Sequence, residues 1–518
     1  MKKLLLFASV LCSFILAAGN RVKIIDLSWS NPTVQFLQKH LADMERDSPG
    51  DGVCIRIYGD RVNHKGRRYY AKDCVWTTAK LEFKHFEKDI EILKKLPFKK
   101  FTDNFFWLTT YYYDLDWYND ADWEQSTANF GVAAKVCRAA GLKGIWFDIE
   151  EYGKRFLDYW KFKNTDVDFK TTSQIAYKRG QQWGREVFRN YPEITLFMPY
   201  MFSLTDRHLG IPFINGIINV MPPTAKIIEG YELNCYHAGK PEDYIKISNM
   251  FYRNADLKAT PENRAKYLNQ VEFAPGYYLD GIFRDRQDYF KNINKQYGGA
   301  CNFMRLTLAG ALEQAKSYIW MYGECGCWWK NSSHPKAKKT WEEQVPGITQ
   351  AIRESVSSKL VFKKDNLLKN PELKDKSGWF AWQFGSENKK NKVPGTVTLG
   401  NGKAVLKNVL WGCISQGGIK VNPGEYYRLQ FRGTNRSNGT AYCQVAFKDK
   451  KGNWLNGVYF YIVPLPATGK FENVSKLITV PPEAASMTVQ LSAKDQGRND
   501  AGEIIYTGAQ ITRLPVNY

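Results

Sequence analysis

The sequence is poor in histidine and lacks the signature motifs of several common enzyme classes. Only 6 His occur in 518 residues, and none stands in the HExxH or HxH spacing of a zinc site. There is no GxSxG nucleophile elbow, and no glycine-rich phosphate loop follows the first predicted strand. These absences argue against a zinc hydrolase, a serine esterase and a dinucleotide-binding enzyme. We predict neither a metal site nor a cofactor.

Long apolar runs are also missing after the amino terminus. The first 19 residues combine a basic start, an apolar run at 4–16 and a small-residue end, which is typical of a secretory signal cut after Gly19. Cys12 follows Leu11 rather than a small residue, so lipidation is not expected. No later run reaches the roughly 18 apolar residues of a membrane span. We therefore expect a soluble bacterial protein, secreted or periplasmic.

Cysteine is too sparse to form a disulfide framework in a protein of this size. Nine cysteines remain after cleavage, and buried free thiols are the default expectation. Two pairs, Cys54 with Cys74 and Cys413 with Cys443, are spaced so that a bridge is conceivable. The spacing of Cys325 and Cys327 is too short for a zinc site.

Basic residues outnumber acidic ones and give a net charge of +21. The lysines are dispersed along the chain, so the charge fits either general solubility or an acidic polymer such as a sulfated or uronic polysaccharide. Nucleic acid is not a predicted partner, and the oligomeric state stays open.

Short apolar runs alternate with longer amphipathic ones through the first two thirds of the chain. Eight strand-then-helix units over about 300 residues predict a (β/α)8 TIM barrel, with a doubly wound sheet as the alternative. The predicted strands are 22–27, 53–58, 105–112, 144–149, 194–199, 227–231, 271–273 and 317–321. We place the signal peptide at 1–19, the barrel at 20–358 and a lysine-rich linker at 359–365.

Residues 366–518 change to short β-rich runs separated by Gly, Asn and Pro turns. This pattern predicts a β-sandwich of the jelly-roll type. Its start, NLLKNPELKDKSGWFAW, resembles the entry strand of carbohydrate-binding jelly rolls attached to secreted glycosidases. That resemblance implies sugar stacking on exposed aromatic rings such as Trp382, Trp411 or Tyr459. Packing against the barrel is the alternative for these rings.

The stretch GLKGIWFDIEEYG, residues 141–153, carries the strongest functional signal. In (β/α)8 enzymes the working residues lie at the carboxyl ends of strands. Alternation along this strand places Trp146, Asp148 and Glu150 on one face. Because carboxylates at the end of an apolar strand are costly unless paired or used, we interpret them as catalytic. Carboxylates at predicted strand ends are Asp26, Asp60, Asp148, Glu150, Glu151, Glu229, Glu232 and Glu324.

The same stretch resembles two families of glycosidase barrels. GLKGIWFDIEEY is similar to the fourth-strand motif of family 18 chitinase-like enzymes, which implies that Glu150 is the acid and Asp148 its support. Trp146 stands where that family has another Asp. In a second register, EEYG resembles the end of the family 35 galactosidase motif, which implies Glu151 as the acid. Both registers support a glycosidase-like barrel without fixing the family.

A second acidic site is predicted in SYIWMYGECGCWW, residues 317–329. Glu324 leaves the last strand among tryptophans, and indole faces stack on sugar rings. We predict Glu324 as the carboxylate opposite Glu150, with Glu229 as the second choice, and Glu151 is the fallback for the acid. Glu229 and Glu232 are nevertheless interpreted mainly as structural. The predicted substrate-binding residues are Tyr152, Trp146, Trp320, Trp328 and Trp329.

The sequence thus predicts a secreted glycoside hydrolase that cleaves a poly- or oligosaccharide with carboxylate acid and base groups. The first alternative is a non-catalytic glycan-binding protein on a barrel scaffold. A basic envelope-binding protein and a lyase acting on acidic polysaccharide are further alternatives. The sugar, the linkage and the stereochemical outcome are left open.

Overall fold

The computed structural model describes most of the chain after the amino terminus. The described residues are 21–28, 31–62, 68–70, 76, 78–109, 115–150, 156–161, 166–202, 208–239, 241–282, 299–330, 339–357, 364–384, 395–423, 425–455, 460–496 and 501–513. The predicted signal peptide, Glu151, Tyr152, Cys74 and Tyr459 lie outside them. In the described part, no helix is both long and apolar enough to cross a membrane.

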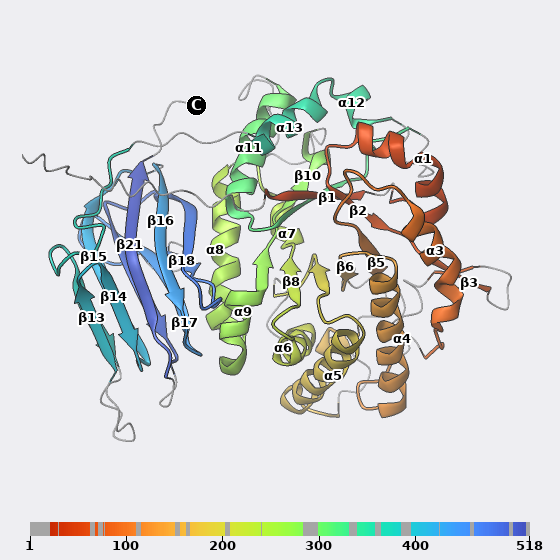
Figure 1. The fold of residues 1–518 in the computed structure, drawn as a ribbon, viewed down its shortest axis with the longest axis horizontal. Coiled ribbons are helices and arrows are strands. Elements are labelled where there is room, and N and C mark those ends of the chain that lie inside the picture. Colours follow the sequence, from red (N-terminus) through yellow and green to blue (C-terminus); the bar gives the residue numbers. More distant parts are fainter. Residues whose placement is uncertain are drawn as a thin grey trace, which may run out of the picture.

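A curled sheet of parallel strands forms the larger, amino-terminal part of the molecule (Figure 1). In pairing order the strands are β10 (Gly276–Tyr278), β11 (Tyr318–Gly323), β1 (Lys23–Ser28), β2 (Gly52–Ile55), β5 (Phe105–Thr109), β6 (Gly144–Asp148), β7 (Thr195–Met198), β8 (Lys226–Glu229) and β9 (Val271–Phe273). The edge strands β9 and β10 are consecutive in the chain. Pro275 lies between them and has no N–H to donate to a ladder. The predicted seventh strand, 271–273, corresponds to β9, and β10 was not predicted.

The prediction of parallel strands surrounded by helices is therefore confirmed, but the sheet is curled and the predicted closure into a (β/α)8 barrel is not seen among the described residues. No ladder joins β9 to β10 in the residues that the structure describes. The covering helices are α1 (Val34–Asp47), α3 (Glu87–Lys95), α4 (Asp120–Ala139), α5 (Phe169–Asn190), α6 (Gly210–Val220), α8 (Pro241–Leu257), α9 (Arg264–Gln270), α11 (Ala300–Gln314) and α13 (Ile348–Ser357). A short hairpin, β3 (Tyr58–Val62) with β4 (Arg68–Tyr70), extends from the sheet.

Helix α6 was not predicted; its sequence, GIPFINGIINV, is short and mostly apolar, and most of its residues are buried. It is buried through a close approach to α5. A Cβ added at Gly180 would lie 1.9 Å from the Phe213 carbonyl oxygen, and one at Gly216 would lie 2.0 Å from that of Tyr177. The two glycines therefore allow the backbones of α5 and α6 to touch.

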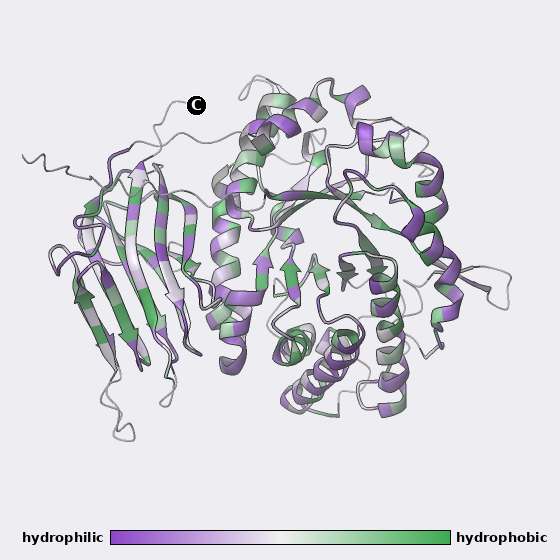
Figure 2. Ribbon diagram, in the orientation of Figure 1, coloured by the Kyte–Doolittle hydropathy of each residue, from purple (hydrophilic) through white to green (hydrophobic). Residues whose placement is uncertain are grey.

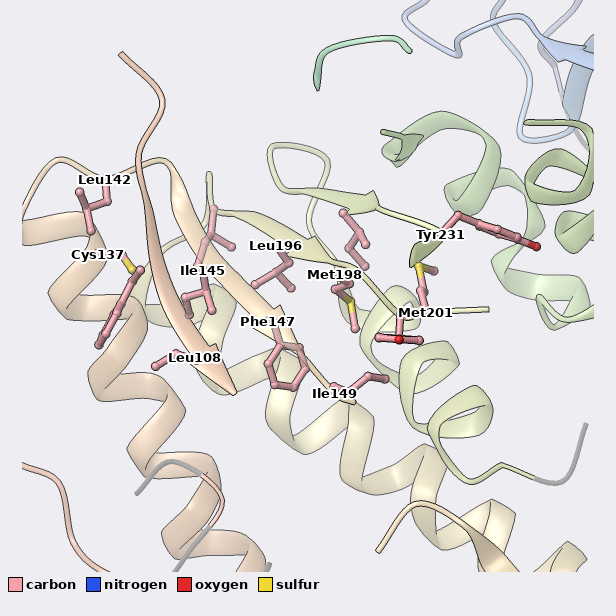
Figure 3. Close-up of a cluster of buried hydrophobic side chains, with 14 of the residues drawn as sticks. Leu108, Cys137, Leu142, Ile145, Phe147, Ile149, Leu196, Met198, Met201 and Tyr231 are labelled. Carbon is pink, nitrogen blue, oxygen red and sulfur yellow. The ribbon is translucent and has the colours of Figure 1, made fainter. Parts of the chain in front are cut away.

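Alternation along the strands separates two apolar layers. Ile145, Phe147 and Ile149 point together toward the surrounding helices, where Leu196 and Met198 meet them (Figure 3). The opposite face of the strands lines the inside of the curl, where the residues are Ile25, Leu27, Cys54, Phe105, Trp146, Phe197, Ile228, Ala274, Tyr318 and Trp320. The strands are coloured mainly hydrophobic, whereas many outward helix residues are hydrophilic (Figure 2).

Polar groups occupy the amino-terminal end of this interior. Lys23 forms an ion pair with Asp103, which also accepts a hydrogen bond of 2.7 Å from the Tyr318 hydroxyl. The buried Glu272 carboxylate pairs with Lys226 at 2.8 Å and with Lys316 at 3.4 Å. Because this network occupies the amino end, a ligand site inside the curl is expected at the carboxyl ends of the strands.

The carboxy-terminal part is a β-sandwich, as predicted. One sheet pairs β12 (Phe380–Phe384), β15 (Trp411–Lys420), β20 (Ser486–Lys494), β17 (Thr440–Lys448) and β18 (Phe460–Pro464). The other pairs β13 (Thr396–Gly400), β14 (Lys403–Lys407), β21 (Ile504–Arg513), β16 (Tyr426–Asn435) and β19 (Glu472–Thr479). The β-rich runs predicted for this region are 403–409, 426–433, 441–448, 458–464, 476–480, 487–493 and 504–512, and they correspond to β14 and to β16 to β21. Strands β13 and β15 were not among them.

The possible Cys413–Cys443 bridge is not formed, and both thiols are free and buried. The two cysteines lie on β15 and β17, which flank β20 on opposite sides. Strands separated by a third strand lie about 10 Å apart, which is too far for a disulfide.

Helix α8 covers the open edge of the sandwich, and α8 and α9 lie between the two parts (Figure 1). Ile245 of α8 belongs to the sandwich core rather than to the core of the curled sheet. Arg428 pairs with Glu313 of α11 at 3.1 Å, and the Lys476 ammonium donates to the Gln314 carbonyl oxygen at 3.1 Å. The two parts thus share buried apolar and polar contacts.

Candidate active site

Strand β6 delivers its acidic residues to the carboxyl end of the curled sheet, as the sequence predicts. Trp146 is inside the curl, stacked on Phe197 with ring centroids 4.4 Å apart. Asp148 ends the strand and Glu150 follows it, so both continue the inward face that Trp146 begins. The neighbouring strand β5 is in register, with Thr109 opposite Asp148.

Asp148 is tied to the backbone that follows it. Its Oδ1 accepts a hydrogen bond of 2.8 Å from the Glu150 backbone N–H. Burial raises the pKa of Asp148 to about 7; the Glu150 N–H opposes that rise, and the nearby Glu150 carboxylate adds to it. At neutral pH this carboxyl group therefore holds a proton for a substantial part of the time.

Glu232 is the third carboxyl group of this site. Burial raises its pKa well above the usual range, and the charges of Asp148 and Glu150 raise it further. Only 7% of Glu232 is exposed, and its Oε1 accepts a hydrogen bond from the Tyr236 hydroxyl. Three carboxyl groups thus interact in a poorly hydrated place, where they cannot all be ionised at neutral pH.

The corner between β8 and the short helix α7 (Glu232–Cys235) explains how Glu232 reaches β6. The Gly230 N–H donates to the Met198 carbonyl oxygen at 2.8 Å, and the Glu232 N–H donates to that of Pro199 at 3.1 Å. Tyr231 between them adopts a left-handed conformation with φ of 50°. These bonds hold the corner against the end of β7, the strand between β6 and β8.

Tyrosine rings connect Glu232 to the end of β11. The Tyr236 ring centroid is 4.8 Å from that of Tyr278 and 6.0 Å from that of Tyr322. The rings of Tyr278 and Tyr322 are stacked at 5.8 Å. All three tyrosines are half-buried, and we call them the tyrosine cluster. Such rings offer flat apolar faces together with hydroxyl groups, which suits a polar ligand with an apolar face.

Glu324, the predicted partner of Glu150, lies at the far end of this cluster. Its Oε1 accepts a hydrogen bond of 2.8 Å from the Tyr322 hydroxyl. The buried Asp280 carboxylate fixes the turn, because it accepts from the backbone N–H groups of Glu324 at 2.7 Å and Cys325 at 3.0 Å. The structure therefore links Glu324 to Glu232 through Tyr322 and Tyr236.

Trp320 crosses the interior beneath these groups. Its Nε1 donates to the Gly230 carbonyl oxygen at 3.1 Å, and its ring meets Trp146 edge-on at 5.5 Å. A Cβ at Gly276 would lie 2.6 Å from the indole, so that glycine leaves room for the ring. Trp146 and Trp320, both predicted to bind substrate, are at most 1% exposed, so their predicted stacking faces are covered and the two rings pack the interior of the curl.

Trp328 and Trp329 lie elsewhere, in the apolar layer on the helix side. The Trp328 Nε1 donates to the Asp26 carboxyl group at 3.2 Å. Both tryptophans are at most 3% exposed, so the stacking surface predicted for them is covered here.

Glu229, a fallback carboxylate, lies on the opposite face of β8 from the interior. Its register partners, Met198 and Phe273, belong to the helix-side layer. Its Oε1 accepts a hydrogen bond of 2.8 Å from the Phe202 backbone N–H. The structure gives Glu229 a role in holding the segment after β7.

The sequence named Glu232 as a strand-end carboxylate but interpreted it as structural. A signal was present, since IIEGYE places a second acidic residue three positions after the strand ends. In the described residues, no group of three His, Cys, Asp or Glu side chains could hold a metal ion.

Comparisons with solved structures find likenesses that each cover about 30% of the chain. No protein-family model matches the chain, and no curated protein matches it. Among solved structures, the enzymatically active domain of tailspike protein 4 of bacteriophage CBA120 is similar over 29% of this chain and 21% of its own, with 21% identity and a TM-score of 0.23. The chain thus spans about a fifth of that domain.

Two carbohydrate-binding modules are matched over almost their whole length. The CBM22-1 xylan-binding domain of Paenibacillus barcinonensis Xyn10C is 13% identical and covers 31% of this chain and 100% of its own, with a TM-score of 0.21. TmCBM61, solved in complex with β-1,4-galactotriose, is 16% identical over 29% of this chain and 99% of its own length, with a TM-score of 0.20. Likenesses at this level establish neither a family nor a function, so the function is argued from the residues.

Proposed function

We propose that this protein is a glycoside hydrolase whose reaction takes place at the carboxyl ends of β6 and β8. The observation that carries the proposal is the cluster of Asp148, Glu150 and Glu232. Cleavage of a glycosidic bond needs one carboxyl group that is protonated at working pH and another that is ionised. Mutual repulsion and burial supply this combination here.

Glu150 is the proposed general acid, because it is more open to the interior mouth than Glu232. A negative charge on Asp148 or Glu232 favours the protonated form of Glu150, because like charges raise the pKa of a neighbouring carboxyl group. The ionised member of the cluster then stabilises positive charge that develops on the sugar ring. Tyr236 positions Glu232 through its hydroxyl group.

The tyrosine cluster is the proposed sugar-binding wall, with Trp146 and Trp320 beneath. The half-buried rings of Tyr278 and Tyr322 offer stacking faces next to the carboxyl groups, and Glu324 is bonded to Tyr322. We retain a poly- or oligosaccharide as the substrate class. In this arrangement Glu324 contacts a sugar hydroxyl or serves as the second carboxylate.

The test compares Glu150→Gln, Glu232→Gln and Glu324→Gln in an assay for new reducing ends on neutral and sulfated polysaccharides. Loss of two or more orders of magnitude in the first two variants, with unchanged thermal unfolding, supports the proposal. If Glu324→Gln loses more hydrolytic activity than Glu232→Gln, Glu324 is instead the second carboxylate of the reaction. Binding of a polysaccharide without cleavage by the unsubstituted protein would contradict hydrolysis and favour a glycan-binding protein.

A further inference from the structure

The exposed aromatic residues of the sandwich are concentrated on the outer face of one sheet. Phe380 is 66% exposed and Trp454 is 48% exposed, and Trp382 and Trp411 are exposed on the same sheet. Paired residues along these strands alternate between the core and this outer face. Large exposed rings gathered on one face of a folded protein indicate a binding surface.

A groove of about 480 Å³ crosses this face. Its sides are the rings of Phe380 and Trp454. Its floor is polar, with Ser415 on β15 and Thr488 and Gln490 on β20. Ser415 and Gln490 lie in one row with Phe380, because Phe380 pairs with Ser415 and Ser415 pairs with Gln490. Thr488 is two residues before Gln490 on the same face of β20.

The shape of the floor depends on an irregularity in β15. The register of β15 against β20 shifts between Gln416 and Ile419, and Gly418 within the shift has a φ of 71°. A Cβ at Gly418 would meet nothing within 4 Å, so this bulge leaves an open, side-chain-free strip in the groove. Across the groove, the Lys448 ammonium lies 4.3 Å from the centre of the Trp454 ring and holds the indole in place.

The floor also carries hydrogen-bonding groups that the protein does not use. In the described part of the chain, the side-chain amide of Gln490 forms no hydrogen bond, and this half-buried amide lines the groove. An amide of this kind between two exposed aromatic rings suits a ligand that has apolar ring faces and many hydroxyl groups. A protein partner would instead require an apolar centre with a polar rim.

We propose that this groove is a second glycan-binding site, separate from the carboxyl cluster, in which a sugar chain lies between Phe380 and Trp454 over Gln490. The Trp382–Trp411 pair is not its wall, because these rings pack edge-on against each other at 5.2 Å and lie outside the groove lining. The helices α8, α9 and α11 meet the sandwich at β17, β18 and β19, and none of their residues lines the groove. The site does not depend on the proposed hydrolysis.

The test is affinity gel electrophoresis of the full chain in gels that contain xylan, mixed-linkage β-glucan, galactan or carboxymethylcellulose. All proteins carry Glu150→Gln, so that the polymer is not degraded. We expect retardation by at least one polymer, weakened at least about tenfold by Trp454→Ala and by Phe380→Ala. Gln490→Ala leaves both rings in place and should also weaken retardation, because it removes the amide beneath the sugar chain.

Phe471→Ala is the matched control, because Phe471 is an exposed ring of the sandwich outside the groove. It should be retarded like the parent protein, and the thermal unfolding of all variants should agree within a few degrees. Retardation that is unchanged in Trp454→Ala and Phe380→Ala, or equally weakened in Phe471→Ala, would overturn the site. So would the absence of retardation by all four polymers.

Discussion

The hydroxyl group of Tyr236 donates a hydrogen bond to the buried carboxyl group of Glu232, one helical turn earlier in the chain. This bond opposes the rise in the pKa of Glu232 that burial and the neighbouring Asp148 and Glu150 carboxyl groups cause. Burial and, after it, the Glu232 carboxylate raise the pKa of Tyr236, so the phenol stays protonated and keeps donating. The pair therefore sets how strongly the cluster holds its proton.

Tyr236→Phe tests this relationship. Removing the donor destabilises the ionised form of Glu232, so the pKa of Glu232 should rise further. We expect the limb of the kcat/KM profile that reports this carboxyl group to move to higher pH by up to about one unit. Tyr278→Phe alters a neighbouring ring and should change KM without moving the profile. An unchanged profile in Tyr236→Phe would remove Glu232 from the reaction.

Gly276→Ala tests whether Trp320 supports the site. The new methyl group would lie 2.6 Å from the indole and force it to shift, which costs about 1–3 kcal/mol of unfolding free energy. The shift should also disturb the bond to Gly230 and lower activity. Gly59→Ala is the control, because its nearest neighbour is the His85 Cβ at 3.3 Å. Urea unfolding measures both variants, and equal stabilities would show that the indole relaxes freely.

Local sequence pattern was sufficient to predict the inward face of β6, because alternation depends only on neighbouring residues. It placed Trp146, Asp148 and Glu150 on one face, and the structure has Ile145, Phe147 and Ile149 on the other (Figure 3). It did not identify Glu232 as their neighbour. That contact arises from a corner between β8 and α7 held by backbone hydrogen bonds to Met198 and Pro199. No periodicity in the sequence encodes such a corner.

Other differences have similar physical causes. The helix α6 is short and mostly apolar, and it is recognisable only once its packing against α5 is known. The strand β15 contains Gly417 and Gly418, which weaken strand propensity but form the bulge in the groove. The paired tryptophans at 328 and 329 were predicted to stack on sugar, yet Trp328 is committed to a hydrogen bond with Asp26. The sequence shows that aromatic residues follow the strand, but it does not show whether their side chains face the interior of the curl or the surrounding helices.

Asp26→Asn should change the pH dependence of stability. Burial raises the pKa of Asp26 to about 7, although Ser28 and Trp328 donate hydrogen bonds that oppose the rise. Between about pH 4 and 7 the folded protein keeps a proton that the unfolded chain releases, so wild-type stability falls as the pH rises. The amide has no proton to release, and it should stabilise the protein at pH 8 by about 2–4 kcal/mol. Urea unfolding at pH 4 and 8 measures this difference. A stabilisation of equal size at both pH values would contradict the raised pKa.

Lys476→Met tests the contact between the two parts of the molecule. Burial lowers the pKa of Lys476 to about 7, and the charge of Glu313 only partly opposes this. Below pH 10.5 the unfolded chain holds a proton that the folded protein releases near pH 7, so stability from this group rises with pH between 7 and about 10. Methionine fills similar space without a charge, and it should stabilise the protein at pH 7 by about 1–4 kcal/mol despite the lost bond to Gln314.

The matched variant is Lys494→Met, because Lys494 also joins the sandwich to the helices but does so at the surface, through an ion pair of 2.9 Å with Asp256. It should alter stability by less than about 1 kcal/mol. Guanidinium unfolding at pH 7 and 9, followed by tryptophan fluorescence, distinguishes the two substitutions. Since Ile245 of α8 lies in the sandwich core, both parts should unfold in a single transition that Lys476→Met moves to higher denaturant. If Lys476→Met instead lowers the stability at pH 7, then Glu313 keeps the buried ammonium charged, and the ion pair stabilises the contact between the two parts of the molecule.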